Sequence, residues 1–246
     1  MTSTPSSRPR PSPGLVVALD GPASSGKSSV GAAAAEALGY RFCDTGLLYR
    51  AATWLALKRE VSAEGDPAAL VALVPEIELI PDAAGRLAHV SVDGDDVTDD
   101  VHTPVVDEHV SAISRVPELR AALLERQRAL ADEPGGIIMA GRDIGTVILP
   151  SADLKIFLDA SVEERARRRT MERGIEAGSA EARQILAQLR QRDQLDRNRA
   201  VAPLRPADDA VHIVTDGNQF EDTVRAVVAA IRAAEERASV APGRRT

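Results

Sequence analysis

The sequence contains few residues of several types on which common classes of protein depend. Its 246 residues include one cysteine, Cys43, which excludes a disulfide within one chain and a zinc site built from several cysteines. One Trp, two Tyr and three Phe are too few for a surface that stacks the bases of single-stranded nucleic acid. No apolar run approaches the roughly 18 residues that a membrane-spanning helix needs.

Basic residues are outnumbered, with 30 Lys and Arg against 37 Asp and Glu and a formal net charge of −7. Because surfaces that bind nucleic acid are usually basic, we expect no nucleic-acid partner. The chain is 44% hydrophobic, enough for one α/β domain with insertions or for two small domains. We expect a monomeric, cytoplasmic globular protein without a membrane partner.

Lysine is rare among the basic residues. Lys27, Lys58 and Lys155 are the three lysines of the sequence, and the other 27 basic residues are arginines. A composition rich in Arg and Ala commonly reflects codon bias, so the number of arginines alone indicates no function. Because lysine is so rare in this chain, a lysine in a chemically demanding position is conspicuous.

Both ends of the chain have compositions typical of disorder. Residues 1–13 are rich in Pro, Ser and Thr and cannot form an apolar face, so we expect a disordered tail. This composition superficially resembles a transit peptide, but its prolines prevent an amphipathic helix and no apolar secretion segment is present. We expect a second, frayed tail over 238–246, which leaves 14–237 as the folded domain.

Between these tails, short apolar segments alternate with helical patterns. The predicted strands are Leu15–Asp20, Tyr40–Cys43, Gly136–Ala140, Leu154–Leu158 and Val211–Thr215, and the main predicted helices are Lys27–Leu38, Leu47–Arg59, Pro117–Asp132, Ser179–Leu195 and Phe220–Arg237. A further, very basic helix begins with the capping-box pair Ser161 and Glu164. This alternation predicts an α/β fold of three layers, with helices on both faces of a mostly parallel central sheet.

One region, at about 63–105, departs from the alternation. Its segments Glu76–Ile80, Leu87–Val92 and Asp95–Val97 alternate apolar and polar residues and are separated by turns. This pattern predicts a small antiparallel insert.

Gly21–Ser28, with the sequence GPASSGKS, fit the phosphate-binding pattern G-x-x-x-x-G-K-[ST] between a buried strand and an Ala-rich helix. Glycines allow backbone N–H groups to converge on phosphate oxygens, and the helix N-terminus adds the positive end of its dipole. We expect Lys27 to reach the β- and γ-phosphates and the Ser28 hydroxyl to ligate Mg²⁺. The alternative is a strand–helix turn that binds nothing; the motif, its context and the rare lysine favour a P-loop.

A P-loop alone leaves GTPases, ATPases, small-molecule kinases and nucleotide sensors open. Three further segments bear on the choice: Asp44–Arg50 after the second strand, Gly141–Asp143 at the end of an apolar strand, and the helical set Arg192, Asp196 and Arg199. Ligands of open α/β sheets bind outside the carboxyl ends of strands, which favours a site at the second segment. Each segment also has an interpretation without a ligand. In the first, Arg50 is a solvated arginine on a helix; the second is a simple ion pair; and the third is a row of salt bridges on a helix surface.

Taken together, these segments resemble the bacterial cytidylate kinases, a family of P-loop nucleoside monophosphate kinases. The likeness covers most of residues 14–235 at matching order and spacing, and rests on the P-loop, DTGLLYR (44–50), the run Ser111–Arg120, GRDIGTVILP (141–150) and RDQLDRNRA (192–200). The motifs GRDIGT and RDxxDRNRA are far more specific to this family than the P-loop is. The resemblance implies that the insert enlarges a monophosphate-binding region and that about 161–180 form a short lid.

The resemblance also implies transfer of the ATP γ-phosphoryl group to CMP or dCMP with Mg²⁺, in pyrimidine nucleotide metabolism. It implies ATP contacts from Gly21, Pro22, Ala23, Ser24, Ser25, Gly26, Lys27, Ser28, Ser29 and the lid residue Arg167, and acceptor contacts from Thr45, Arg50, Ser111, Arg120, Arg142, Asp143, Arg192, Asp196 and Arg199. Lys27, Arg142 and Arg192 are the expected catalytic residues, because cations offset the repulsion between two phosphates and hold them in line.

The polar groups of the acceptor suggest a division of roles. Cytosine presents an amine donor beside the N3 and O2 acceptors, and Asp143 with Arg120 is a complementary pair. We expect Thr45 and Ser111 to supply hydroxyl contacts, and Asp196 to accept from sugar hydroxyls and orient Arg192.

One position departs from the family pattern, since Ala140 stands where an acidic residue usually precedes GRD. Either Asp20 or ordered water supports Mg²⁺ instead, or metal binding is weakened. Two alternatives to the cytidylate kinase interpretation stay open. One is a kinase for another small acceptor, such as UMP or a shikimate-like metabolite, and the other is a nucleotide-binding module without turnover.

Overall fold

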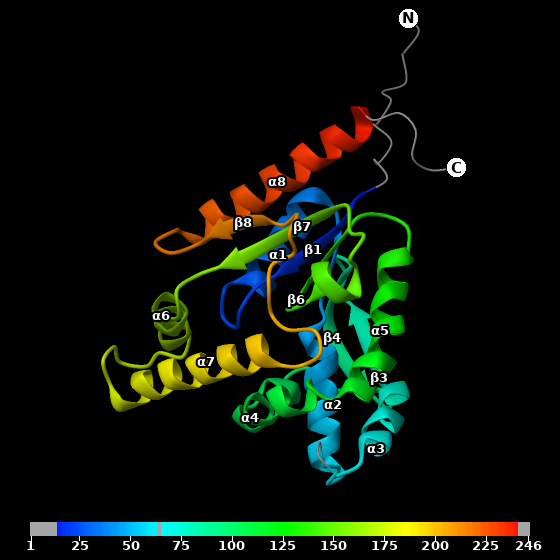
Figure 1. Cartoon of the computed structure of the whole chain (residues 1–246), viewed down its shortest axis with the longest axis vertical. Helices are drawn as coiled ribbons and strands as arrows, with labels where there is room; N and C mark the ends of the chain where they lie inside the picture. The colour runs from blue at the N-terminus through cyan, green and yellow to red at the C-terminus, as the bar shows by residue number, and fades with distance from the viewer. Residues whose placement is uncertain (1–13, 63–64, 241–246) are drawn as a thin grey trace, which may run out of the picture.

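An eight-stranded sheet runs through the computed structural model, which describes residues 14–62 and 65–240 (Figure 1). Its strands are β1 (Val16–Asp20), β2 (Arg41–Asp44), β3 (Ile77–Pro81), β4 (Arg86–Val92), β5 (Asp95–Asp96), β6 (Ile137–Gly141), β7 (Leu154–Asp159) and β8 (Val211–Val214). They lie in the order β3-β4-β2-β6-β1-β7-β8, and β5 pairs with β4. The neighbours from β4 to β8 are parallel, whereas β3 and β5 run antiparallel to β4. The predicted mostly parallel α/β sheet is confirmed.

Helices cover both faces of this sheet. The helices of the described residues are α1 (Lys27–Leu38), α2 (Gly46–Lys58), α3 (Pro67–Ala72), α4 (Pro104–Ile113), α5 (Pro117–Asp132), α6 (Val162–Glu172), α7 (Ala180–Asn198) and α8 (Phe220–Val240), of which α6 and α7 pack on each other beside the sheet. Alternate residues of β1 point to opposite layers: Leu19 packs with apolar residues of α1 and α8, and Ala18 packs with those of α5 and of the single π-helical turn η3 (Ile144–Ile148). No described helix has the length and apolarity needed to cross a bilayer.

The insert extends the main sheet. β3 and β4 form the expected antiparallel pair, with Ile77 opposite Val92. The sequence pattern did not predict that β4 also pairs in parallel with β2, where Cys43 lies opposite Leu87. Apolar residues of β3, β4 and helices α2 to α5 form a second core beside the main one.

Local sequence explains how several helices begin and end. Gly39 ends α1 in the left-handed conformation at φ 67°, as its position predicted. Ser161 accepts a hydrogen bond from the Glu164 N–H at 3.2 Å, but the backbone N–H of Ser161 donates to Asp216 rather than to Glu164. Half of the predicted capping box therefore forms. The tail expected over 1–13 lies outside the described residues, and α8 continues to Val240, into the segment expected to fray.

The sheet order brings three polar loops to one edge. β6 lies between β1 and β2, and in the parallel register Asp20 is opposite Gly141 and Asp44 is opposite Ala140. The P-loop, the DTG turn and the GRD segment each leave the carboxyl end of one of these strands, where ligands of α/β sheets bind.

Gly31 of α1 provides a test of how closely this helix packs on the sheet. A Cβ at this position would lie 2.5 Å from Cε2 of Phe42 and 3.0 Å from Cδ2 of Leu19. We expect Gly31→Val to lower the free energy of unfolding by about 2–3 kcal/mol, because the buried ring has no room to move. Urea denaturation measures this change.

Ala37→Val is the matched control, because Ala37 is exposed on the same helix. Its cost should be limited to helix propensity, about 0.5 kcal/mol. Equal effects of the two substitutions would show that α1 moves away from the sheet without penalty.

Candidate active site

The loop after β1 forms a backbone cradle at the start of α1. Ser24 and Gly26 adopt left-handed backbone conformations, with φ 57° and 90°. Such a conformation is strained for Ser24, and strain of this kind is typical of functional sites. Within the described part of the chain, no side chain caps the first turn of α1. Converging N–H groups at an uncapped helix N-terminus bind anions, phosphates above all.

Lys27 is buried in this cradle, and its Nζ donates to the carbonyl oxygen of Pro22 at 2.7 Å. Burial, and after it the charge of Arg142, lower the pKa of Lys27 well below its usual value. Arg192 acts on this pKa in the same direction. Lys27 therefore shares one electrostatic environment with the arginines after β6 and on α7, and an anion bound among them would favour its charged form.

Asp20, a possible support for a metal ion, is bonded to the backbone after β6. Its two oxygens accept hydrogen bonds from the N–H groups of Ile144, at 2.8 Å, and Gly145, at 2.7 Å. Burial raises the pKa of Asp20 to about 6. This carboxylate fixes the loop that carries Arg142 and Asp143.

Asp44 is the carboxylate that is hydrogen-bonded to Ser28, the predicted metal ligand. The Ser28 hydroxyl donates to Oδ2 of Asp44, and Oδ1 accepts from the Gly46 N–H at 2.9 Å. Residues 14–62 and 65–240 contain no group of three or more His, Cys, Asp or Glu able to hold a metal ion by themselves. A hydroxyl with one carboxylate suits Mg²⁺, which is usually bound by few protein ligands together with waters and substrate phosphates.

Arg50 and Arg192 converge on Asp107, which the sequence analysis did not single out. Nη2 of Arg50 donates to Oδ1 of Asp107 at 2.5 Å, and its Nη1 donates to the carbonyl of Val101 at 2.9 Å. Nη1 of Arg192 lies 4.0 Å from the same carboxylate oxygen. Burial, and next the charge of Arg142, lower the pKa of Arg192 to about 10. Two of the three arginines expected to bind the acceptor phosphate, Arg50 and Arg192, therefore already lie beside one anion.

Asp196 pairs with a different arginine from the one expected. Its Oδ2 lies 3.1 Å from Nε of Arg142. Asp196 was expected to orient Arg192, one turn earlier on α7. Nη1 of Arg192 lies 4.0 Å from Asp107 of α4, while the charge of Asp196 also acts on Arg192 and raises its pKa. Asp196 therefore sets the position of the arginine that follows β6.

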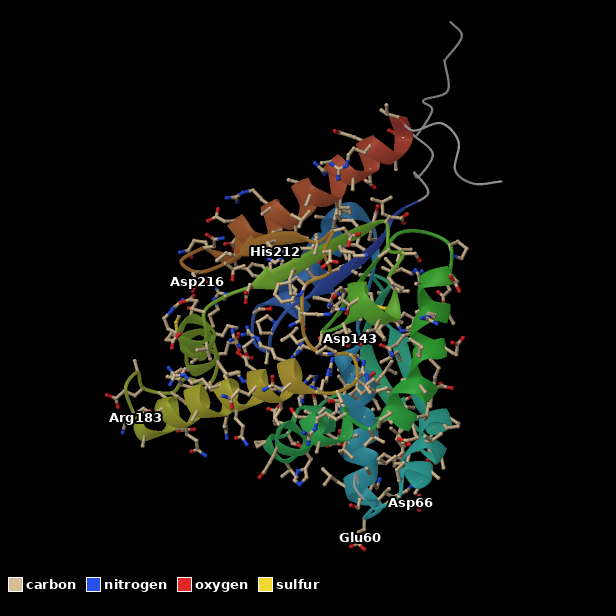
Figure 2. All side chains as sticks on the ribbon, viewed as in Figure 1. Glu60, Asp66, Asp143, Arg183, His212 and Asp216 are labelled. Carbon is tan, nitrogen blue, oxygen red and sulfur yellow. The ribbon has the colours of Figure 1, made fainter. Side chains whose placement is uncertain are left out.

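Asp143 lies in the middle of the molecule (Figure 2), where it is buried and contacts two arginines. Its Oδ2 pairs with Nη2 of Arg120, and its Oδ1 lies 3.1 Å from Nη2 of Arg199. The guanidinium of Arg120 lies 5.3 Å from the ring centre of Tyr49 and also donates to the carbonyl of Ser114 at 3.1 Å. The structure thus brings together Asp143, Arg120 and Arg199 from three distant segments.

The two predicted hydroxyl contacts come from different elements, Thr45 from the N-cap of α2 and Ser111 from α4. Thr45 donates to the carbonyl of Ala140 at 2.9 Å and lies so close to Gly141 that a Cβ there would be 2.9 Å from the Thr45 hydroxyl. Ser111 lies on α4, one turn after Asp107.

The arginines of α6, in the segment predicted to form a lid, have partners in different parts of the chain. Arg167, the predicted ATP contact, has 57% of its side chain exposed and pairs with Glu164 of its own helix. Arg169 and Arg173 instead turn toward Oδ2 of Asp107, at 2.9 and 3.4 Å. α6 and its C-terminal cap therefore contact the same carboxylate as Arg50.

Three residues that the structure places in or beside the site were missed by the sequence analysis: Asp44 as a partner of Ser28, Asp107, and Asp193. A signal for Asp107 is present, because it precedes the predicted contact Ser111 by four residues and so shares its helix face.

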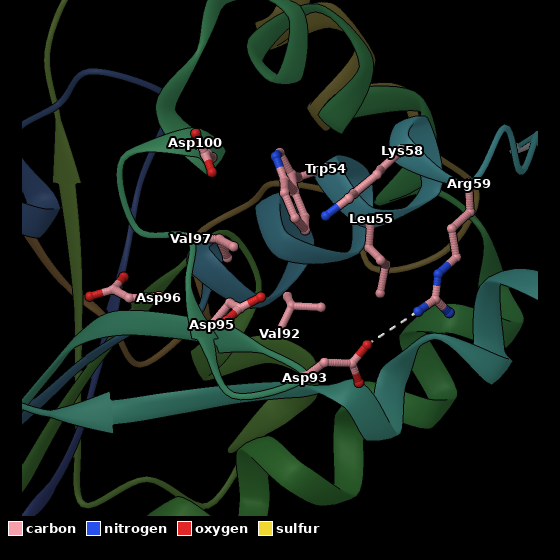
Figure 3. A pocket seen from close by; sticks show the side chains of 10 residues that line it. All are labelled: Trp54, Leu55, Lys58, Arg59, Val92, Asp93, Asp95, Asp96, Val97 and Asp100. Atoms are coloured by element: carbon pink, nitrogen blue, oxygen red, sulfur yellow. Dashed lines mark hydrogen bonds and ion pairs between the residues drawn. The ribbon is translucent and has the colours of Figure 1, made fainter.

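A separate hollow of about 370 Å³ lies on the insert (Figure 3). Trp54 and Lys58 of α2 line one side, with the ammonium of Lys58 4.5 Å from the indole ring, and Asp95 and Asp96 of β5 line the other. None of the predicted site residues lines it.

Arg165 connects α6 to the P-loop. Its side chain is 2% exposed, forms a two-point ion pair with Asp193 of α7, and donates to the carbonyl of Ala23 at 3.0 Å. We expect Asp193→Asn to lower the free energy of unfolding by about 3 kcal/mol, because it leaves a buried cation without its counter-charge. Chemical denaturation measures this loss.

Glu163→Gln is the control, since the Glu163–Arg190 pair joins the same two helices at the surface. Exposed pairs contribute little, so this variant should remain close to the parent. If both variants lost the same stability, burial would not be the source of the effect.

The comparisons with known proteins agree with this geometry. The model of the family described as cytidylate kinase matches residues 17–233. A cytidylate kinase from Pelotomaculum thermopropionicum is 42% identical over 88% of this chain and 96% of its own length, and one from Nocardia farcinica is 43% identical over 85% and 90%. A bifunctional pantoate ligase/cytidylate kinase from Synechocystis is 45% identical over 87% of this chain, which spans only 42% of that relative. The chain belongs to the cytidylate kinase family.

Proposed function

We propose that this chain transfers the γ-phosphoryl group of ATP to CMP or dCMP, giving CDP or dCDP. The observation that carries the proposal is the convergence of the P-loop with Arg142: the P-loop and the GRD segment leave neighbouring parallel strands where Asp20 lies opposite Gly141, and Arg142 pairs there with Asp196 of α7. The charges of Arg142 and Arg192 both lower the pKa of Lys27, in agreement with this arrangement. Transfer between two anionic phosphates needs cations around the moving group, and this arrangement supplies them.

On the donor side, the cradle of residues 21–29 holds the ATP phosphates through backbone N–H groups, with Lys27 at the β- and γ-phosphates. Ser28, supported by Asp44, contributes to the Mg²⁺ site, and the hydrogen bond between them supports this choice over Asp20. When bound, Mg²⁺ neutralises phosphate charge and orients the triphosphate. Asp44 thereby makes an acidic residue at position 140 unnecessary.

On the acceptor side, Arg50, Arg142 and Arg192 bind the monophosphate. Asp143 accepts from the cytosine amine while Arg120 donates to the ring acceptors. Each carboxylate oxygen has two lone pairs, so the bonds to Arg120 and Arg199 leave Asp143 able to accept another. Uracil would present its O4 to this carboxylate, which disfavours UMP.

We also propose that the enzyme acts as a monomer in the cytoplasm. Lys27, Arg142 and Asp143 come from one chain and converge on one edge of its own sheet, which supports activity without a partner subunit. The cytoplasm is where ATP and CMP are both available.

An ADP-release assay with ATP and Mg²⁺ tests the proposed function across CMP, dCMP, UMP, AMP and shikimate. We expect CMP and dCMP to be the preferred acceptors. Lys27→Met should lower turnover about a thousandfold, because its charge stabilises the transferring phosphoryl group, while CMP still binds. Preference for another acceptor would replace the substrate proposal, and no release with any acceptor would favour a non-catalytic module.

The carboxylate that reads the base can be tested separately with Asp143→Asn. The amide introduces a donor that faces uracil O4, and one polar contact discriminates by about 1–3 kcal/mol. The variant should lose efficiency with CMP and show a narrower CMP/UMP ratio in steady-state kinetics.

Asp196→Asn is the matched control, since it makes the same change in another buried partner of an arginine. We expect it to lower efficiency with CMP and UMP alike. If Asp143→Asn behaved in the same way, Asp143 would order the arginines without reading the base.

A further inference from the structure

Asp107 occupies the centre of a group of arginines drawn from three helices. Its Oδ1 accepts from Arg50 at 2.5 Å and lies 4.0 Å from Arg192, and its Oδ2 lies 2.9 Å from Arg169 and 3.4 Å from Arg173. We call these four residues the arginine cluster. They come from α2, α6 and α7, whereas Asp107 comes from α4, which lies beside α7 (Figure 1).

The carboxylate is charged and only 17% exposed. Burial alone would raise the pKa of Asp107, but the charges of Arg50, Arg169 and Arg192 hold it below its usual value. One negative charge among four cations leaves an excess of positive charge, so the arginine cluster still attracts a further anion.

A carboxylate and a phosphate are bound by the same face of a guanidinium group. Nη2 of Arg50 already donates to Asp107, and its Nη1 donates to the carbonyl of Val101. A phosphate that binds Arg50 and Arg192 therefore competes with Asp107 for their donors.

We propose that Asp107 is a positioning residue that acts as an internal counter-ion in place of the acceptor phosphate. It keeps the arginine cluster together before substrate binds and releases Arg50 and Arg192 when a phosphate monoester dianion arrives. A dianion brings more charge than the carboxylate it replaces, whereas a monoanion brings no gain. The proposal rests on the proposed function, because it is the acceptor phosphate that takes over these arginines.

A purely structural brace between α4 and the lid predicts the opposite effect on binding. Removing a brace would displace the arginines and weaken phosphate binding. Removing a competing anion leaves their charge uncompensated and strengthens it. The sign of the change therefore separates the two roles.

Asp107→Asn in the full chain tests the proposal, with inorganic phosphate as the probe. Its affinity is obtained from the rise in melting temperature with phosphate concentration at constant ionic strength, a readout that also serves a less stable variant. We expect about tenfold tighter phosphate binding, since one negative charge is lost within a few ångströms of the anion. In turnover with CMP, KM should fall and kcat should not rise.

Two further variants control this result. Asp107→Glu keeps the charge and should bind phosphate within about threefold of the parent, since the longer side chain still reaches the arginines. Glu108→Gln removes the same charge from an exposed neighbour on α4 and should have little effect.

Unchanged or weaker phosphate binding by Asp107→Asn would overturn the proposal. So would the absence of any phosphate-dependent stabilisation in the parent chain. The titration needs no turnover, so a failure of the proposed function, seen as no ADP release with any acceptor, is distinguished from a failure of this inference.

Discussion

The site depends on neutralising arginines that are crowded at one edge of the sheet. Six arginines in or beside the site each lie beside a carboxylate from another segment of the chain or from a neighbouring helix: Arg165 pairs with Asp193, Arg142 with Asp196, Arg120 and Arg199 with Asp143, and Arg50 and Arg192 lie beside Asp107. A buried cation without such a partner is strongly destabilising. The ion pairs that assemble the site are therefore also contacts that the folded chain needs to stay folded.

These ion pairs define geometry more than they add stability. Burying two charges costs nearly as much as their attraction returns, so a buried pair is weak evidence for stability. A carboxylate that accepts from two arginines does, however, fix the distance and angle between them. Asp143 does this for Arg120 and Arg199, and the result is a rigid polar group formed before any ligand binds.

Sequence patterns predicted what local physics determines. The helix Lys27–Leu38 was predicted with its observed bounds, because a strand, a P-loop and Gly39 define both of its ends. The pairing of β4 with β2 and the choice of Arg142 by Asp196 were not predictable in this way. Both depend on which distant segment packs nearby, and no local signal in the sequence indicates that Asp196 pairs with Arg142 instead of Arg192, one turn earlier on α7.

The anchoring of α6 limits how the site can rearrange. Arg165 joins the start of α6 to the carbonyl of Ala23 and to Asp193, so a swing of the whole helix would break a buried ion pair. The contacts of Arg169 and Arg173 with Asp107 lie nearer the C-terminal end of α6 and are more exposed, so breaking them costs less. Exchange of a carboxylate for a phosphate therefore needs new side-chain conformations in the arginine cluster, while the buried pairs keep the helices in place.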